Sequence, residues 1–139
     1  MRPNDIIYQK CNAVSFYRLW IEFLAPFHKL TPRERDVAAR IIAQYFKFKA
    51  SVQDPEDKEI LKELLWSQTS RKDMRESLKM SQAHFQMILA KLREAKVLLD
   101  GDLNPKYIPH VSDDPRFMLG IIFDWSSPSN PIRNEQEQA

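Results

Sequence analysis

The side chains with the most useful recognition chemistry in this sequence lie on one face of a helix predicted to follow Ser81. At about 100° per residue, the face opposite the apolar stripe of that helix carries small, amide and few charged groups: Ala83, His84, Gln86, Met87, Ala90, Lys91 and Glu94. A face that meets only solvent usually alternates Glu and Lys, whereas a helix in the major groove of DNA needs short or amide side chains near its start. The pattern therefore predicts contact with base edges.

Two kinds of DNA contact are expected from this part of the chain. Hydrogen-bonding groups on the predicted helix should contact base edges, with Met87 beside them: Gln82, His84, Gln86 and Lys91. Basic side chains should contact phosphates, and Ser81 should cap the helix and touch phosphate as well: Arg71, Lys72, Lys79 and Lys106. From Ser70 to Lys96 there are seven basic residues against three acidic ones, which favours a polyanionic partner although the whole chain carries only +2.

The same search finds no spacing typical of catalysis or metal binding. The three histidines lie far apart in sequence, with no cysteine or carboxylate at ligand spacing: His28, His84 and His110. The run Asp100 to Asn104 resembles the start of a calcium loop, but Pro105 and Val111 stand where such a loop has glycine and glutamate. No nucleophile accompanies His84 locally, so DNA contact is the better interpretation of this residue. We expect a protein that is not an enzyme and holds neither a metal nor a cofactor.

A pair of short helices separated by a tight turn must position these side chains. The first is predicted to begin at Ser70 as its cap, with Asp73 completing a capping-box-like pattern. Lys79 and Met80 form the turn, and Ser81 caps the second helix. The apolar stripe of the second helix follows the i, i+3, i+4, i+7 spacing and faces the core: Phe85, Ile88, Leu89 and Leu92.

A short hairpin is predicted directly after this helix pair. Val97 to Leu99 can form one strand, Asp100 and Gly101 supply the turn, and Lys106 to Ile108 can return as the second strand. Strand, turn and strand after a recognition helix make a wing.

Three further helices are predicted upstream. The first runs from about Asn12 to Phe27, is apolar on most sides and ends at Pro26. The second has Thr31 as its cap and runs to about Phe48, leaving several polar side chains to water or phosphate: Arg33, Arg35, Arg40, Gln44 and Lys47. The third begins at Asp54-Pro55 and ends near Trp66, with four side chains predicted to be buried: Ile60, Leu61, Leu64 and Leu65.

From about Leu30 to Pro109 the chain resembles a winged helix-turn-helix domain. The run MSQAHFQMILAKLREAKVL is similar to the cap, recognition helix and first wing strand of that class, and LNPKYI after the turn resembles plasmid replication initiators. The resemblance implies a DNA-binding regulator of the kind found in bacteria and phages. The sequence departs from the class pattern at Lys96, where such proteins commonly have a glycine between helix and wing, and in its short wing.

The expected organisation is a mainly α protein with four parts. Residues 1–29 form an N-terminal segment with the apolar helix, and residues 30–110 form the winged helix-turn-helix domain. Residues 111–125 form a C-terminal apolar, strand-like segment that packs on the domain or on a partner protein, and residues 126–139 form a disordered tail.

Composition bounds the class of protein. A hydrophobic content of 43% with 11% aromatic residues indicates a globular chain. The two glycines, Gly101 and Gly120, disfavour phosphate-cradling loops and nucleophile elbows, which need close backbone approach. The single cysteine, Cys11, cannot form an internal disulfide, and the longest apolar run, Phe117 to Phe123, is too short to span a membrane. We expect a cytoplasmic protein that does not enter the membrane.

The sequence favours a protein that binds specific duplex DNA and regulates transcription or replication, encoded by a phage or another mobile element. The alternative is a non-enzymatic structural or assembly protein, such as a phage component, that uses the same fold to bind proteins. The two most apolar segments, Asn12 to Phe27 and Phe117 to Trp125, need cover on a second side. A homodimer would provide that cover and would suit two half-sites of DNA, but the two segments could instead cover each other within one chain.

Overall fold

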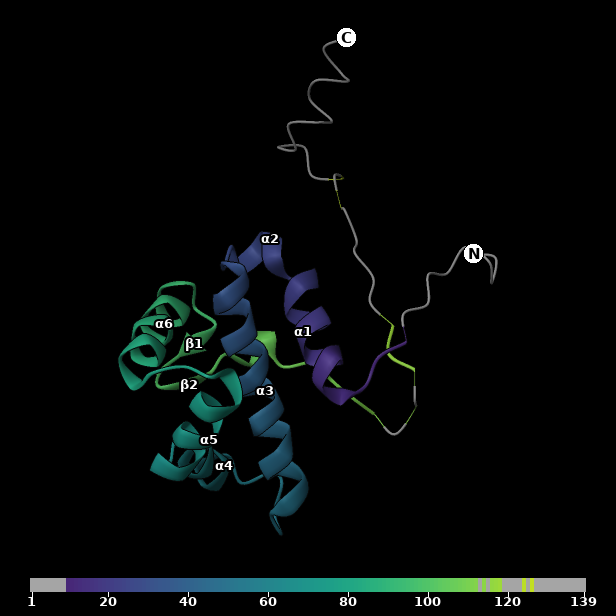
Figure 1. The fold of residues 1–139 in the computed structure, drawn as a ribbon. Helices are drawn as coiled ribbons and strands as arrows, with labels where there is room; N and C mark the ends of the chain where they lie inside the picture. Colours follow the sequence, from purple (N-terminus) through teal and green to yellow (C-terminus); the bar gives the residue numbers. More distant parts are fainter. Residues whose placement is uncertain (1–9, 113, 115, 119–123, 125, 127–139) are drawn as a thin grey trace. The chain divides into compact units, whose positions relative to one another are not determined.

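The computed structural model describes residues 10–112, 114, 116–118, 124 and 126. The chain divides into two units, residues 1–109 and residues 110–139. The described part of the first unit contains six α-helices and a two-stranded antiparallel sheet, which confirms the mainly helical prediction (Figure 1). The predicted strand between Phe117 and Trp125 lies mostly outside the described residues, as does the predicted tail.

The apolar N-terminal segment forms two helices where one was predicted. Helix α1 covers Ala13–Phe23 and begins with a capping box between Asn12 and Ser15. Helix α2 covers Ala25–His28. The prediction that Pro26 ends the first helix is wrong, because Pro26 lies in the first turn of α2, where a missing N–H leaves no intrahelical hydrogen bond unmade.

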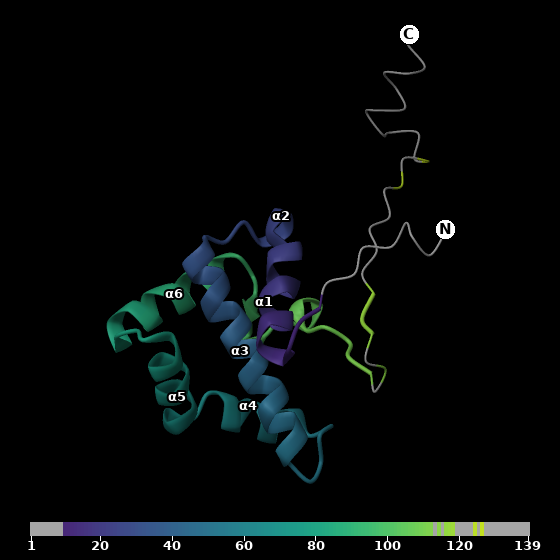
Figure 2. The same ribbon diagram turned by 45° about the vertical axis from the view of Figure 1, so that its right-hand side comes forward.

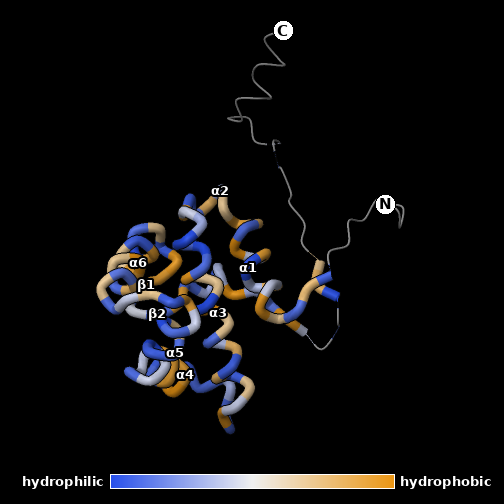
Figure 3. Tube along the Cα trace, in the orientation of Figure 1, coloured by the Kyte–Doolittle hydropathy of each residue, from blue (hydrophilic) through white to orange (hydrophobic). Residues whose placement is uncertain are grey.

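Helix α3, Pro32–Ser51, has the predicted start. The Thr31 side chain accepts a hydrogen bond from the Glu34 amide, and the Glu34 carboxylate accepts one from the Thr31 amide. The helix contacts α1, α4, α5 and α6, and two views show it between α1 and the pair α5–α6 (Figures 1 and 2). Hydrophobic and hydrophilic residues alternate along the helices, as expected where one face of each is buried (Figure 3). Helix α3 is therefore the central element of this unit.

Gln44 of α3 corrects one prediction. It was expected to face water or phosphate, but it is buried and its Nε2 donates to Ser70 Oγ over 3.2 Å. A buried amide needs hydrogen-bond partners, and Ser70, which is also buried, supplies one to Gln44.

Helix α4 covers Lys58–Leu65 and begins later than predicted. Asp57 caps it, and Asp54-Pro55 lies in the preceding turn region. Leu61 and Leu65 are buried as predicted, whereas Ile60 is exposed and Leu64 is half-buried. The buried side of α4 is therefore narrower than predicted, with Leu61 and Leu65 at its centre.

Helices α5, Gln68–Leu78, and α6, Gln82–Glu94, form the predicted helix pair. Ser67 caps α5, so the prediction of Ser70 as its cap is wrong. The turn is correct: Lys79 adopts the left-handed conformation at φ 53°, and Met80 is buried behind it. Ser81 caps α6 by accepting a hydrogen bond from the His84 amide. All four residues predicted for the apolar stripe of α6 are buried: Phe85, Ile88, Leu89 and Leu92.

The hairpin after α6 is shorter than predicted. Strand β1, Leu98–Leu99, pairs antiparallel with β2, Asp102–Leu103, around a turn at Asp100 and Gly101. The second strand was predicted at Lys106 to Ile108, which is wrong. Residues Pro105–Tyr107 form a 3-10 helix, η2, because Pro105 has no N–H for a strand ladder and the Asn104 side chain caps the turn.

Lys96 joins α6 to the hairpin in the left-handed conformation, at φ 61°. Its carbonyl accepts a hydrogen bond from Asn104 Nδ2 over 2.8 Å, and the backbone N–H of Asn104 donates to the Val97 carbonyl. A side chain is disfavoured in this conformation, which accounts for the glycine preferred at this place in the class that the sequence resembles.

Lys96→Gly should therefore raise the free energy of unfolding by up to about 1 kcal/mol, since glycine removes the strain but adds chain entropy to the unfolded state. Urea denaturation followed by circular dichroism measures the change. Lys47→Gly, on the exposed side of α3, is the matched control and should lower stability by about 1 kcal/mol. Equal losses in the two variants would contradict the strain at Lys96.

Polar contacts attach the N-terminal helices to the rest of the unit. Arg18 Nε lies 2.8 Å from Asp36 of α3, and Arg35 of α3 lies 3.0 Å from Glu22 of α1. The hydrogen bond from Arg18, followed by the one from Arg35, lowers the pKa of the Glu22 carboxyl below its usual value. Trp20 Nε1 donates to the Tyr107 carbonyl over 2.8 Å. Helix α1 is thus bound both to α3 and to η2.

His28 has a structural role. Its Nδ1 accepts a hydrogen bond from the Leu30 amide, so the neutral ring carries its proton on Nε2, which lies 2.8 Å from the Ile21 carbonyl. The ring is buried between the end of α2 and Tyr107. These contacts explain why a histidine lies at position 28.

Candidate nucleic-acid interface

The exposed face of α6 carries mostly small or flexible side chains along its centre and different polar side chains on its two sides. At about 100° per residue, Ala83, Met87 and Ala90 point directly away from the buried stripe. Met87 is 59% exposed, and the two alanines are exposed as well. Because Ala83, Met87 and Ala90 are small or flexible and uncharged, this part of the α6 backbone can approach a flat or grooved partner closely, whereas Glu94 places a charge at the C-terminal end of the same face.

The candidate side chains do not all share one flank of α6. Gln82, Gln86 and Arg93 lie on one side of the exposed face, whereas His84 and Lys91 lie on the other. His84 is half-buried, and Lys91 Nζ lies 3.5 Å from Glu94 on the same helix. A partner must therefore contact both sides of α6 to engage the whole predicted set.

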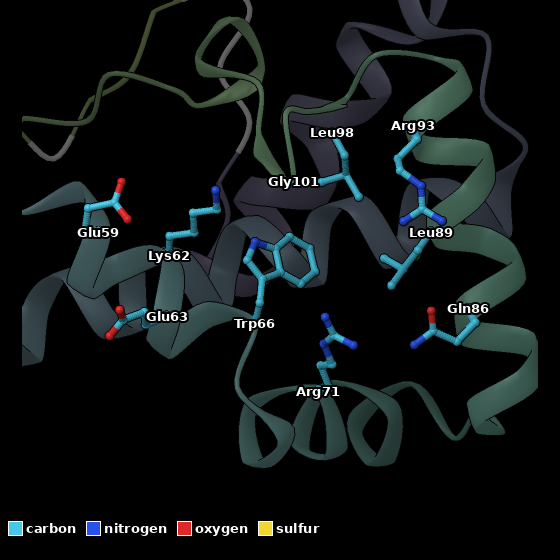
Figure 4. Close-up of a pocket in the computed structure, with 10 residues that line it drawn as sticks. All are labelled: Glu59, Lys62, Glu63, Trp66, Arg71, Gln86, Leu89, Arg93, Leu98 and Gly101. Carbon is cyan, nitrogen blue, oxygen red and sulfur yellow. The ribbon is translucent and has the colours of Figure 1, made fainter.

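A cleft of about 430 Å³ runs along the Gln86 side of α6 (Figure 4). Helix α4, the start of α5, α6 and the hairpin enclose it, and its lining residues are Glu59, Lys62, Glu63, Trp66, Arg71, Gln86, Leu89, Arg93, Leu98 and Gly101. Figure 4 shows Trp66 in the middle, with Arg71, Gln86 and Arg93 around it and both glutamates at the α4 end. The structure thus brings two predicted residues, Arg71 and Gln86, into one site.

The cations of this cleft have few protein partners. The Arg71 guanidinium carbon lies 5.9 Å from the centre of the Trp66 ring. Within the part of the chain that the structure describes, Arg71 Nε is buried without a hydrogen-bond partner, and neither Arg71 nor Arg93 pairs with a carboxylate. Lys62 Nζ donates to the Asp100 carbonyl over 3.4 Å. Unpaired guanidinium groups beside an aromatic ring are well suited to an anionic partner.

Trp66 is held in place by the hairpin. Its Nε1 donates to Asp102 Oδ1 over 3.3 Å, and the same oxygen accepts from the Leu103 amide over 2.8 Å. The indole therefore has a fixed position between α4 and β2.

Lys79 lies at the opposite end of α5 from Arg71, about 12 Å away along the helix axis. It borders a second, smaller depression of about 270 Å³ between α1, α3 and the turn, which is rich in basic side chains: Arg18, Arg33, Arg40 and Lys79, with one acid, Asp36. Arg33 also donates to the Leu78 carbonyl, which holds it against the turn. This depression is a second cationic surface beside the helix pair.

The other two predicted phosphate contacts lie elsewhere. Lys72 is exposed on α5, with its Nζ 4.0 Å from Glu76. Lys106 lies in η2 and not in the hairpin, and the next residue, Tyr107, contacts Trp20 and His28. The prediction that Lys106 lies in a wing strand is wrong, because Pro105 has no N–H for a strand ladder and Pro105–Tyr107 form η2 instead.

Eight of the ten cleft residues were absent from the predicted set, among them two cations and the aromatic ring: Lys62, Arg93 and Trp66. A signal existed for Arg93, because it follows Gln86 by seven residues and so shares its side of α6. Lys62 and Trp66 reach the site only through the packing of α4 against α5, which helical spacing within α6 could not show.

The described residues also bear on metal binding and on membrane insertion. No group of three or more His, Cys, Asp or Glu lies close enough there to hold a metal ion. Among the same residues, none of the helices has the length and apolar character needed to cross a membrane.

Comparison of the chain with protein-family models, with curated proteins and with solved structures finds no match.

Proposed function

We propose that this chain is a winged helix-turn-helix protein that binds duplex DNA sequence-specifically and regulates transcription or replication without catalysing a reaction. In this proposal α6 is the recognition helix and the β1–β2 hairpin is the wing. One observation carries it: α6 exposes a small, amide-bearing face while four apolar side chains anchor its other side, and two cationic surfaces lie beside the helix pair.

The dimensions of α6 suit the major groove. Its thirteen residues extend about 20 Å, and a groove about 12 Å wide accepts one helix. Ala83 and Ala90 allow the backbone to approach the base edges, where Gln82 and Gln86 can donate and accept hydrogen bonds. Lys91 and His84 contact the other side of the groove.

The phosphates on the two sides of the groove would meet different cations. Arg71 and Arg93 of the cleft would contact the phosphates of one DNA strand. Lys79, with Arg33 and Arg40 of α3, would contact those of the other. This division follows from the two cationic surfaces at opposite ends of α5. Lys72 and Lys106 then make only peripheral contacts with phosphate.

Selection from a pool of random duplexes at about 50 mM salt tests this function. The purified chain should retain duplexes that share a short motif, and Gln86→Ala should weaken binding to that motif by roughly 1–3 kcal/mol while leaving random DNA unaffected. Recovery of no motif after repeated rounds would reject sequence-specific binding.

The exposed apolar side of α1 favours a homodimer. Leu19, Phe23 and Phe27 are 43%, 37% and 69% exposed, and they follow one another at helical spacing or just beyond the end of α1. Two copies related by a two-fold axis would bury these side chains and place two recognition helices on half-sites about one helical turn apart.

Phe23→Glu should therefore convert a dimer into a monomer, because it places a charge in the apolar contact. Light scattering at micromolar concentration measures the mass. Met87→Glu, an exposed apolar residue on α6, is the control and should remain dimeric. A monomeric mass for the unchanged protein would contradict the dimer.

The same apolar surface favours the second candidate function, a structural or assembly protein. In that case Leu19, Phe23 and Phe27, together with the C-terminal apolar segment, would contact another protein instead of a second copy. The selection experiment separates the two functions, since an assembly protein would recover no DNA motif.

A further inference from the structure

The cleft beside α6 has an apolar floor that phosphate contacts alone would not require. Trp66, Leu89 and Leu98 line it together with the cations. A backbone phosphate could pair with Arg71 and Arg93 but would leave the half-buried indole of Trp66 facing water, at a cost proportional to its exposed apolar area. The composition of the cleft therefore indicates a ligand with both an anionic group and a flat apolar body.

We propose that this cleft binds a small planar aromatic anion, a ring that carries one phosphate or carboxylate group. The ring stacks on Trp66, whose orientation is fixed by the hydrogen bond to Asp102, and the anionic group lies between the guanidiniums of Arg71 and Arg93. In Figure 4 the labelled cationic side chains lie around the indole, and the Arg71 guanidinium carbon is 5.9 Å from the centre of its ring. The cleft volume of about 430 Å³ falls in the range typical of small-molecule sites.

The charges of the cleft determine the orientation in which the ligand would bind. Arg71 and Arg93 lie at the α5–α6 end, whereas Glu59 and Glu63 lie at the α4 end (Figure 4). An anionic group is attracted to the first end and repelled from the second, so a ligand with an anion at each end would fit poorly.

Occupancy of the cleft would also affect DNA binding if the proposed function holds. Arg71, Gln86 and Arg93 line the cleft and are also assigned contacts with DNA, so a bound ligand would compete for them. The ligand would then act as an effector that lowers the affinity for DNA. This regulatory step rests on the proposed function, whereas the ligand site itself does not.

Isothermal titration of the full chain without DNA tests the site. The probes are AMP and 2-naphthoate, which combine a ring with an anion, and adenosine and inorganic phosphate, which supply only one of the two. AMP, 2-naphthoate or both should bind with a Kd below about 1 mM, and the two partial probes should bind at least about tenfold more weakly. Binding of AMP alone would identify phosphate as the anionic group, and binding of 2-naphthoate alone would identify carboxylate.

Variants locate the binding. Arg93→Met removes an exposed cation without disturbing the core and should weaken the bound probe by on the order of tenfold, as should Arg71→Met. Lys47→Met, on α3 outside the cleft, should bind as the unchanged protein does. In NMR spectra the Trp66 indole N–H signal should shift on titration and should not shift in Arg93→Met at the same probe concentration.

Three results would overturn the ligand site: no binding of either complete probe, adenosine binding as tightly as AMP, or unchanged affinity in Arg93→Met. Each is measured without DNA. A failure of the ligand site is therefore distinguishable from a failure of the DNA-binding function.

Discussion

Replacement of Phe85 by alanine should lower the free energy of unfolding by about 3–5 kcal/mol, the cost of a cavity at a buried phenyl ring. Phe85 is 0% exposed and is the largest fully buried side chain among the residues that the structure describes. It holds α6 against the core on the side opposite its exposed face, so its loss should also loosen the helix pair. Urea denaturation followed by circular dichroism gives the difference.

Met87→Ala is the matched control for Phe85→Ala. Met87 is two residues further along α6 but faces solvent, so the change should alter stability by no more than about 0.5 kcal/mol. If both variants lost similar stability, or if Phe85→Ala lost less than about 1 kcal/mol, the orientation of α6 described above would be wrong.

Affinity for duplex DNA should fall by on the order of a hundredfold or more between about 50 and 200 mM salt, provided that four or more phosphates are contacted. The reason is the release of counterions from each neutralised phosphate. In the proposed function, the contacts that carry this effect come from Arg71 and Arg93 of the cleft and from Arg40 and Lys79 of the second depression. Fluorescence anisotropy of a labelled duplex over a salt series measures the slope.

Arg40→Met should reduce the salt slope by about one and weaken all duplexes alike, because a phosphate contact carries no sequence information. Lys47→Met, which lies on α3 outside both cationic surfaces, should leave the slope unchanged. Affinity that stays flat across the salt range would favour the assembly-protein function.

Local signals predicted the helix starts where a cap and its partner are adjacent in sequence. Thr31 with Pro32 and Glu34, and Ser81 before the apolar stripe of α6, are confirmed because both caps act within one helical turn. The stripe itself is confirmed for the same reason, since the helical repeat alone determines which side chains share a face.

The errors arise where a distant contact decides between two local alternatives. Ser67 and Ser70 are both acceptable caps, and Ser70 is excluded because Gln44, on another helix, binds its hydroxyl in the core. The second strand was placed at Lys106 to Ile108 because its side chains suit a strand. Instead, Asn104 ends the hairpin early by binding the Lys96 carbonyl and capping η2. Helical and strand spacing contain no information about such contacts.

The candidate site could be predicted only in part for a related reason. Gln82 and Gln86 share a side of α6, which the helical repeat shows directly. The cleft also needs Lys62 and Trp66 from α4, Arg71 from α5, and Leu98 and Gly101 from the hairpin, and these come together through tertiary packing. The predicted set therefore contained Arg71 and Gln86 without indicating that they line one cleft together with Trp66.

The most direct test of the central claim is the binding of a selected duplex by the unchanged chain and by Met87→Glu. Met87 lies at the centre of the exposed face of α6 and contributes little to the core, so a glutamate there should leave the fold intact while it repels the DNA backbone. In an anisotropy titration at about 50 mM salt, the unchanged chain should bind the selected duplex, and Met87→Glu should bind it at least on the order of tenfold more weakly with an unchanged circular dichroism spectrum. Equal binding by the two proteins would show that α6 does not enter the groove, and the absence of binding by the unchanged chain would contradict the DNA-binding function itself.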